Sequence, residues 1–417
     1  MVKELIFGVV GGLSLFIYGI WEMSEGLHKA CGDRMKKILH NFTGSPIKGV
    51  LVGTGITSII QSSSATTVMI IGFVNAGLMS LVQALGVIFG ANIGTTITAQ
   101  LIAFKLTDYA LPIIGLGMLI TLTARKKSQR YIGEFLLGFG ILFLGLNILT
   151  NVVQPLGEYP LFNNILISFS KNSLLGVLAG AVITAILQSS SVTTGMVIGL
   201  SMANLVDLKA AVPLILGCNI GTCVTALIAS VGTNISAKRV AMAHIMFNAI
   251  GVVIFLPFLG LFERIVVSMS SELPRQIANA HTLFNITNTI IFLPFTYLYA
   301  NFLTRIFKGK EEEELEYMPK FLESHLLNTP PIALEAAIKE TVRTLGLTQK
   351  MVNLTMDSFF KNDPNSLGGI ACSEEAVDSL REAITSYLVE LMQRELSLDE
   401  SRKIPAPLST QLMILKG

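Results

Sequence analysis

Apolar stretches of about 20 residues recur along the chain between Glu4 and Thr304, separated by short polar or basic segments. A helix of about 20 apolar residues is long enough to cross the ~30 Å hydrocarbon core of a bilayer. The composition agrees, because 51% of the residues are hydrophobic and only 14% are charged, against about 25% charged in a typical soluble domain. We therefore predict an all-α integral membrane protein. The N-terminal apolar run lacks a strongly basic start and an A-x-A exit, so it predicts a first membrane helix rather than a signal peptide.

The pattern changes after Thr304 and predicts two domains with a linker between them. Residues 305–331 are rich in charge and end in two prolines, which is typical of a linker. From Ile332 onward apolar residues recur at helical spacing, with a second helix expected over 373–396. We predict a membrane domain over 1–304 and a small soluble helical domain over 332–417.

A long internal repeat lies in the membrane domain. Gln61 and Gln188 are 127 residues apart, and so are Asn92 and Asn219. The stretches around them align without a gap, and the identities gather in the polar motifs QSSS, TT and NIGT rather than in Leu and Val. Because chance similarity between apolar helices would match apolar residues, we infer a duplication. The sequence predicts one repeat over about 1–124, a second over about 131–261, and an extra helix over about 278–304.

The basic segments predict how the repeats lie in the membrane. Positive charge favours the cytoplasmic side, which places four segments there: 28–37, 125–130, 238–239 and 305–310. The stretches 151–170 and 265–274 are nearly free of Lys and Arg and are expected outside, as is the N-terminus. Single spans satisfy these constraints only if 47–76 and 173–204 are re-entrant helical hairpins that enter from opposite sides. That is the inverted-topology plan of secondary transporters, whose site lies at the midplane. A shorter repeat, in which 241–258 is similar to 278–295, predicts a pair of scaffold helices.

The duplicated polar motifs predict a site for an anion together with cations. Polar groups survive at membrane depth only inside protein or beside water, and a helix broken at QSSS would present backbone N–H groups to an anion. Lys, Arg, Asp and Glu are absent from both hairpin cores and from both NIGT segments. An uncompensated buried dianion is prohibitively costly, so co-bound cations must supply the charge. Sodium is the natural candidate, and protons remain an alternative.

Other classes of function fit the sequence less well. The net charge of +2 is too small to indicate nucleic-acid binding, and the four cysteines show no disulfide or zinc spacing. His244 and His281 occupy matching A-x-A-H-x-x-F-N motifs and predict satisfied packing histidines rather than proton carriers. An intramembrane serine hydrolase would need a general base beside its serine. The serines occur in two triplets, and neither triplet has a base of its own, which argues against this class.

The paired QSSS motifs, each followed by G-x-N-I-G-T, resemble those of the sodium–phosphate cotransporter family. The resemblance covers nearly the whole membrane body and implies sodium-coupled phosphate transport by alternating access. It implies phosphate contacts from the tips and the NIGT asparagines: Gln61, Ser62, Ser63, Ser64, Gln188, Ser189, Ser190, Ser191, Asn92 and Asn219. Sodium ligands are expected among the neighbouring oxygens of Gln188, Thr222, Thr225, Thr95, Thr66 and Thr193. Cys218 stands where some relatives have serine, which leaves one sodium ligand undefined.

The same resemblance sets the remaining expectations. It implies inorganic phosphate as a partner, Na⁺ as the co-transported ion and no organic cofactor. The apolar spans make the lipid bilayer a partner and predict a multi-pass protein of the inner cell membrane, and the basic segment 305–310 places the C-terminal domain in the cytoplasm. Export of phosphate, transport of arsenate or sulfate, and assembly as a homodimer remain open. The segment "LLNTPPIALEAAIKETVRTLGLTQKMVN" resembles the start of a PhoU-like domain. Because that domain ends soon after a second helix, it is either truncated or completed by a partner.

Overall fold

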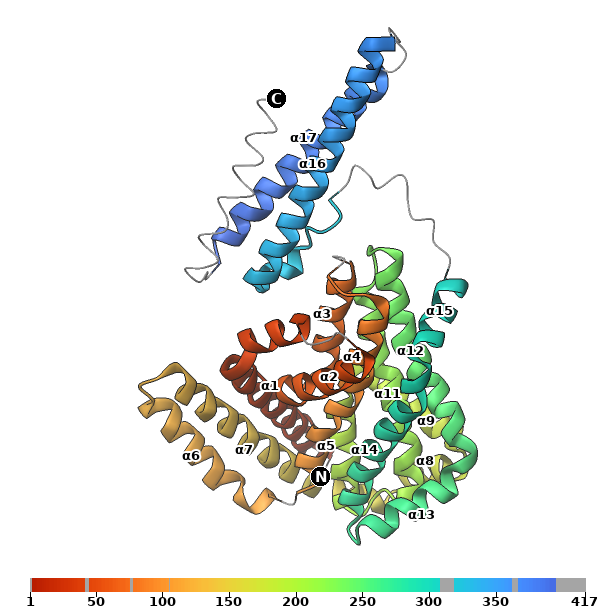
Figure 1. Cartoon of the computed structure of the whole chain (residues 1–417). Coiled ribbons are helices and arrows are strands. Elements are labelled where there is room, and N and C mark those ends of the chain that lie inside the picture. Colours follow the sequence, from red (N-terminus) through yellow and green to blue (C-terminus); the bar gives the residue numbers. More distant parts are fainter. Residues whose placement is uncertain are drawn as a thin grey trace. The chain divides into compact units, whose positions relative to one another are not determined.

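The computed structural model describes residues 2–41, 45–75, 78–104, 106–307, 319–361 and 367–394. Every regular element among these residues is a helix, as predicted (Figure 1). The chain divides into two compact units, which are described separately. The first contains Met1–Ile71, Leu81–Gly232 and Lys238–Ile306, and the second contains Gly72–Ser80, Thr233–Ala237 and Phe307–Gly417.

Fifteen α-helices precede residue 307 within the described part of the chain. They are α1 (Val2–Asn41), α2 (Pro46–Ile60), α3 (Ser63–Asn75), α4 (Leu81–Gly94), α5 (Thr96–Ile102), α6 (Ala110–Thr123), α7 (Lys127–Val153), α8 (Pro160–Lys171), α9 (Ser173–Leu187), α10 (Ser190–Met202), α11 (Leu208–Ala229), α12 (Ile235–Phe255), α13 (Leu259–Met269), α14 (Leu273–Phe292) and α15 (Thr296–Ile306). Short 3-10 helices lie at η1 (Thr107–Tyr109), η2 (Gln154–Glu158), η3 (Leu256–Phe258) and η4 (Leu293–Phe295).

Six helical segments are long and apolar enough to cross a bilayer: Lys3–Ala30, Leu81–Ile102, Lys127–Glu158, Leu208–Ala229, Ile235–Met269 and Leu273–Ile306. Many large apolar side chains on these helices are exposed, such as Phe7 at 73% and Val253 at 66%. Exposed apolar surface on this scale is matched to lipid rather than water. The protein is an integral membrane protein. The segments around α4 and α11 are the most enclosed, with 78% and 72% of their apolar windows buried.

Helix α1 packs closely along α7 through glycines (Figure 1). A Cβ added at Gly19 would lie 2.2 Å from the backbone nitrogen of Leu142, and one added at Gly138 would lie 2.2 Å from that of Met23. Real Cβ atoms do not approach other atoms so closely, so only glycine permits this spacing. Small residues at membrane-helix contacts act in this way because helix association in lipid relies on close packing.

The pairs α2–α4 and α9–α11 pack through equivalent glycines. A Cβ at Gly90 would lie 2.0 Å from the carbonyl oxygen of Val50, and a Cβ at Gly217 would lie 2.0 Å from that of Val177. These positions are 127 residues apart, as the sequence repeat requires. The local packing of the two stretches is therefore the same, while the orientation of each stretch in a membrane stays a prediction.

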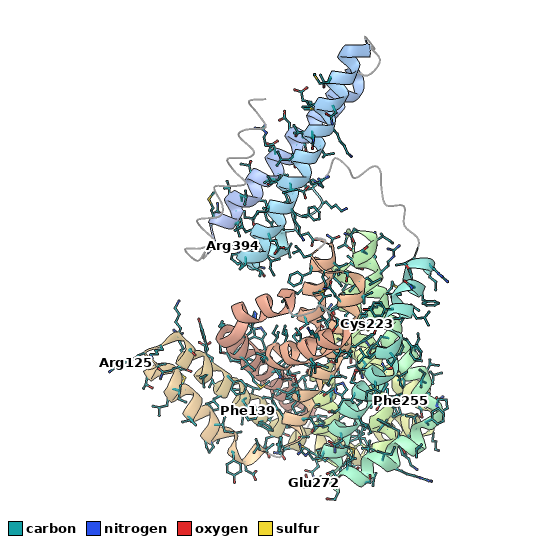
Figure 2. The ribbon with its side chains drawn as sticks, viewed as in Figure 1. Arg125, Phe139, Cys223, Phe255, Glu272 and Arg394 are labelled. Atoms are coloured by element: carbon teal, nitrogen blue, oxygen red, sulfur yellow. The ribbon has the colours of Figure 1, made fainter. Side chains whose placement is uncertain are left out.

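The shorter repeat, 241–258 and 278–295, also forms similar structures. Helix α12 leads through η3 into α13, and α14 leads through η4 into α15, so both Leu-Pro-Phe segments form a 3-10 turn between two helices. Proline at the second position suits such a turn, since it has no N–H to leave unpaired. Figure 2 shows Phe255 at the end of α12, Cys223 on α11, and Arg125 at the turn between α6 and α7.

The second unit contains the hairpin of α16 (Pro330–Lys361) and α17 (Leu367–Met392), which lie side by side (Figure 1). The carboxylate of Glu340 is fully buried and accepts hydrogen bonds from the backbone nitrogens of Lys320, at 2.7 Å, and Phe321, at 2.6 Å. Arg343 pairs with the same carboxylate. Burial raises the pKa of Tyr387, whose hydroxyl donates to the carbonyl oxygen of Glu323 at 3.1 Å. These contacts fasten 319–323 to the hairpin.

Three sequence-based boundaries differ from the structure. The basic stretch 28–37, expected as a loop, is part of α1. Pro330 and Pro331 begin α16 instead of ending a linker, because proline is favoured in the first helical turn, where its missing N–H is not needed. The second helix of the soluble domain was expected over 373–396 but is α17, which begins at Leu367 and ends at Met392.

The two histidines are buried as expected, but they are not satisfied. His244 is 1% exposed and His281 is 0% exposed. Neither ring has a hydrogen-bond partner for either nitrogen within the described residues. Both histidines are therefore packed inside the protein, but the expectation that their ring nitrogens are hydrogen-bonded is wrong.

Candidate functional site

Each QSSS motif interrupts a helix in the same way. Gln61 ends α2 with φ 59° and ψ 19°, and Gln188 ends α9 with φ 54° and ψ 22°. Both lie in the left-handed region, which non-glycine residues enter at a cost of roughly 1–2 kcal/mol. The backbone N–H of each glutamine donates to a threonine carbonyl four residues earlier at 2.7 Å. The same strained turn therefore occurs in both repeats, 127 residues apart.

A threonine pair fastens the two arms of each interrupted helix. The hydroxyl of Thr57 donates to that of Thr66 at 3.0 Å, and Thr184 donates to Thr193 at 2.9 Å. Thr66 and Thr193 in turn donate to the carbonyl oxygens of the first serine of each motif, at 3.0 and 3.2 Å. All four threonines are buried. These hydroxyls hold the shape of the turns.

The two motifs meet at one cavity of about 260 Å³, far above the ~10–15 Å³ that a single water requires. Ten residues expected in the site line it: Gln61, Ser62, Ser63, Ser64, Thr95, Gln188, Ser189, Ser190, Ser191 and Thr222. The helix breaks thus bring together residues that are far apart in sequence.

The other five expected residues lie beside the cavity without lining it. Asn92 and Asn219 are buried, and each donates its side-chain amide to the carbonyl four residues earlier, at 2.8 and 3.0 Å. Thr66 and Thr193 belong to the threonine pairs above. Thr225 reaches the site indirectly, because its hydroxyl is hydrogen-bonded to that of Ser64 at 3.1 Å.

The electrostatics of the cavity come from helix ends rather than formal charges. None of the described residues that line it is acidic, basic or a histidine. Helices α3 and α10 begin at Ser63 and Ser190, so two partially positive N-termini reach the cavity wall. Helices α2 and α9 end at the glutamines of the same wall, which brings two partially negative C-termini there. Such a wall suits an anion at the N-termini and small cations at the free carbonyl ends.

The two motifs differ in one respect that the sequence repeat hides. Gln61 is 6% exposed, accepts a hydrogen bond from the hydroxyl of Thr98 and donates to the carbonyl of Ser58. Gln188 is exposed at the equivalent position. The first glutamine is thus fixed in a buried network, whereas the second faces open space in the cavity.

Sequence reasoning missed one wall of the cavity. Ile17, Ile20, Trp21 and Ser24 of α1 line it, together with Leu187. These residues lie in an apolar helix whose inward face no motif marks. Trp21 is the single tryptophan of the chain, and this was the one signal that could have drawn attention to that face.

Comparison with known proteins gives one family match and several curated relatives. A family model described as Na⁺/Pi-cotransporter matches residues 15–151 and 158–279. The Escherichia coli K12 protein named putative inorganic phosphate export protein YjbB is 26% identical over 397 residues, which cover 95% of this chain and 73% of that protein.

Two other relatives match shorter parts. The uncharacterized protein YqeW of Bacillus subtilis is 33% identical over 257 residues, covering 62% of this chain and 83% of that protein. The human sodium-dependent phosphate transport protein 2B is 34% identical over 138 residues, covering 30% of this chain and 20% of that protein. No solved structure matches the chain.

Proposed function

Because the chain belongs to the Na⁺/Pi-cotransporter family, we propose that it carries inorganic phosphate across the membrane by sodium-coupled alternating access. Phosphate binds between the tips Ser62–Ser64 and Ser189–Ser191. The observation that carries this proposal is a cavity without charged lining residues that both QSSS motifs share, at the meeting point of two helix N-termini. Hydroxyls and backbone N–H groups there are donors of the kind that phosphate oxygens accept.

Sodium coupling follows from the charge of the site. A phosphate dianion in a cavity without a cationic side chain is unstable unless cations enter with it. Gln188, Thr222 and Thr95 supply oxygens at the cavity wall, and Thr225 lies one hydrogen bond behind it. Oxygen ligands are those that hard cations prefer. Na⁺ therefore provides the compensating charge, and the two ligands bind cooperatively.

The lengths of the four helices support a re-entrant, inverted arrangement. Helices α2 and α9 have 15 residues, and α3 and α10 have 13. Such helices extend about 20–22 Å, short of the ~30 Å needed to span the membrane core. Each pair enters and returns on one side, with the two pairs entering from opposite sides. Alternating access then exposes the cavity between the tips to each side in turn.

Export is the second candidate for the direction of transport. The relative that matches 95% of the chain is named as a phosphate export protein, and a coupled carrier runs down whichever combined gradient dominates. The same cavity would also accept arsenate or sulfate, which are tetrahedral oxyanions. An intramembrane serine hydrolase fits poorly, because no described residue of the cavity wall could act as a base for the serines.

Phosphate uptake into proteoliposomes tests the proposal. Purified protein should accumulate labelled phosphate when Na⁺ is higher outside, and replacement of Na⁺ by K⁺ or choline should abolish uptake. A proton ionophore in the presence of the sodium gradient separates sodium coupling from proton coupling. Sodium-independent uptake, or uptake that collapses only with the ionophore, would contradict the proposed coupling, and absence of phosphate movement under all gradients would contradict the substrate.

We propose that the C-terminal domain over 332–417, whose described part is the hairpin of α16 and α17, is a PhoU-like domain. Glu374 and Asp378 in α17 resemble the E-x-x-x-D metal motif of PhoU proteins. Asp378 is 57% exposed and pairs with Arg381 at 3.3 Å. Because Glu374 and Asp378 are both exposed, a solvated helix face explains this pair of carboxylates. The proposed role of this unit is to modulate transport from the cytoplasmic side.

A further inference from the structure

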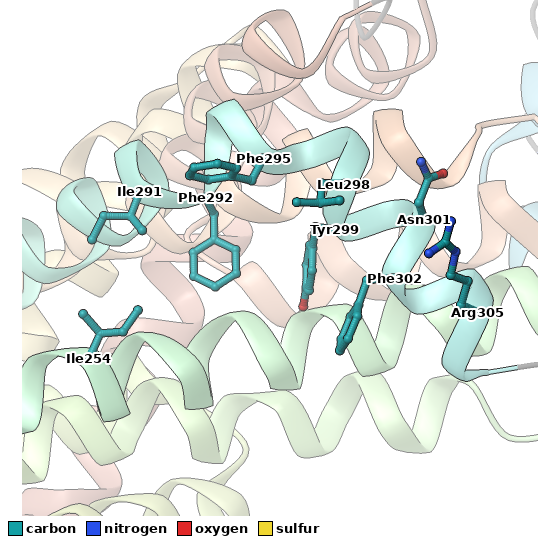
Figure 3. Close-up of a pocket in the computed structure, with 9 residues that line it drawn as sticks. All are labelled: Ile254, Ile291, Phe292, Phe295, Leu298, Tyr299, Asn301, Phe302 and Arg305. Carbon is teal, nitrogen blue, oxygen red and sulfur yellow. The ribbon is translucent and has the colours of Figure 1, made fainter.

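A second cavity lies away from the QSSS site, beside α15. It has a volume of about 440 Å³ and is formed by α12, α14, η4 and α15 (Figure 3). We call it the α15 groove, and its open side is formed by Ile254, Ile291, Phe295, Leu298, Phe302 and Arg305. From these residues we propose that the α15 groove binds one anionic phospholipid, with an acyl chain along the apolar part and the phosphate at Arg305.

The apolar lining fits an acyl chain. Leu298 is 67% exposed, Phe295 is 57% exposed and Phe302 is 44% exposed. The floor is closed by Tyr299, whose hydroxyl donates to the carbonyl of Ala243 at 2.8 Å and so does not face the groove as a free donor. A concave apolar surface on a membrane-spanning segment is filled by lipid chains, because water there would be costly.

The polar end fits a phosphate group. Asn301 and Arg305 are one turn apart on α15 and lie together at one end of the groove, opposite Ile254 and Ile291 (Figure 3). Arg305 has no hydrogen-bond or ion-pair partner within the described residues. A guanidinium at the edge of the hydrocarbon gains most from a phosphate, which it can hold with two parallel hydrogen bonds.

The length of the groove agrees with one leaflet. The fourteen residue steps from Ile291 to Arg305 extend about 21 Å at ~1.5 Å per residue. Half of a bilayer, headgroup region included, is about 20–22 Å thick. The groove therefore runs from near the midplane to the headgroups, with its cationic end at the surface. If the basic segment 305–310 is cytoplasmic, the lipid belongs to the inner leaflet.

A second copy of the chain is a weaker occupant of the same groove. A two-fold contact would bring the same surface against itself, and the groove contains Arg305 but no acidic side chain among its lining residues. Such a contact would cover the apolar part and leave the charge unmatched. A phospholipid satisfies both parts.

Lipid retention by the full-length protein in mild detergent tests the proposal, in the absence of Na⁺ and phosphate. Native mass spectrometry would count bound phosphatidylglycerol and phosphatidylcholine, and thermal unfolding would follow each titration. We expect phosphatidylglycerol to bind preferentially, and Arg305→Gln to weaken its binding about fivefold or more, as expected for one basic residue near a lipid surface. The control Arg264→Gln changes another exposed arginine, outside the groove, and should leave binding unchanged.

A second pair of variants tests the apolar part. Leu298→Trp fills the groove and should lower the number of retained lipids, whereas Leu261→Trp, at a residue 59% exposed on α13, should not. Equal binding of both lipids, equal loss in Arg305→Gln and Arg264→Gln, or a lipid-independent dimer that Leu298→Trp dissociates would each overturn the proposal. If Leu298→Trp does not fold, the arginine pair still decides, because both of those side chains are exposed.

Discussion

The hydroxyls of Thr225 and Ser64 share a hydrogen bond at 3.1 Å, although the two residues are 161 positions apart in sequence. Thr225 also donates to the carbonyl oxygen of Thr222 at 2.9 Å. Thr225 follows the second NIGT motif and Ser64 belongs to the first QSSS motif, so the bond between them joins the two halves directly behind the cavity wall. The equivalent threonine of the first half, Thr98, bonds instead to Gln61 within its own half. The repeated sequence therefore produces two different connections.

Thr225→Val should loosen this junction. It keeps the shape of the side chain but removes the hydroxyl, and a neutral hydrogen bond contributes about 0.5–1.5 kcal/mol. We expect the phosphate concentration that gives half-maximal thermal protection in saturating Na⁺ to rise roughly two- to tenfold. Thr225→Ser should restore it. Thr123→Val, at an exposed threonine that bonds only within α6, should match wild type. A wild-type response of Thr225→Val would remove this bond from the site.

Ser190→Ala tests the position of the anion. Ser190 begins α10, is 4% exposed and lines the cavity. Loss of one small donor should weaken phosphate protection about tenfold, as for a hydrogen bond to a charged group, without a change in the unfolding temperature of the ligand-free protein. Ser201→Ala is the control, because Ser201 is on the same helix and bonds to the carbonyl of Ile198 outside this cavity. Unchanged phosphate protection in Ser190→Ala would show that the anion lies elsewhere.

Much of the fold can be predicted from the sequence, and so can the two QSSS motifs that line the site. Hydropathy predicts the apolar helices, and the topology required by the basic segments predicts that both QSSS motifs interrupt helices. The offset of 127 predicts that they do so in the same way. The wall supplied by Trp21 and Ser24 has only one signal in the sequence, the single tryptophan, because an apolar membrane helix has no polar face to show which side turns inward. The different exposure of Gln61 and Gln188 was equally hidden, since tertiary partners decide it rather than the local motif.

The two glutamines should respond differently to the same substitution. Gln61→Ala leaves the buried hydroxyl of Thr98 without its acceptor, which should cost about 1–3 kcal/mol of stability and lower the unfolding temperature of the ligand-free protein. Gln188→Ala removes an exposed side chain and should leave that temperature unchanged while it raises the Na⁺ requirement. Thermal unfolding with and without Na⁺ measures both effects. Equal destabilisation by the two variants would contradict the difference in burial.

Helix packing around the first motif can be tested with two neighbouring glycines of α2. A Cβ at Gly53 would lie 2.3 Å from the carbonyl oxygen of Val87 in α4, whereas a Cβ at Gly55 meets no atom within 4 Å. Overpacking costs about 1–3 kcal/mol or more. We expect Gly53→Ala to lower the unfolding temperature and transport together, and Gly55→Ala to resemble wild type. Similar effects of both changes would mean that helix propensity, not the contact with α4, governs these positions.

Thr222→Val isolates the cation part of the site. Thr222 lines the cavity and donates its hydroxyl hydrogen to the carbonyl of Cys218 at 2.9 Å, so the oxygen keeps its lone pairs for a cation. Valine preserves the volume and removes that oxygen. We expect the Na⁺ concentration for half-maximal uptake to rise several-fold, with little change in the phosphate dependence at saturating Na⁺, because binding of the two ligands is linked. Thr222→Ser, which keeps the oxygen, should restore the sodium dependence. The measurement is initial phosphate uptake into proteoliposomes across a Na⁺ series, and an unchanged sodium dependence in Thr222→Val would exclude this residue as a ligand.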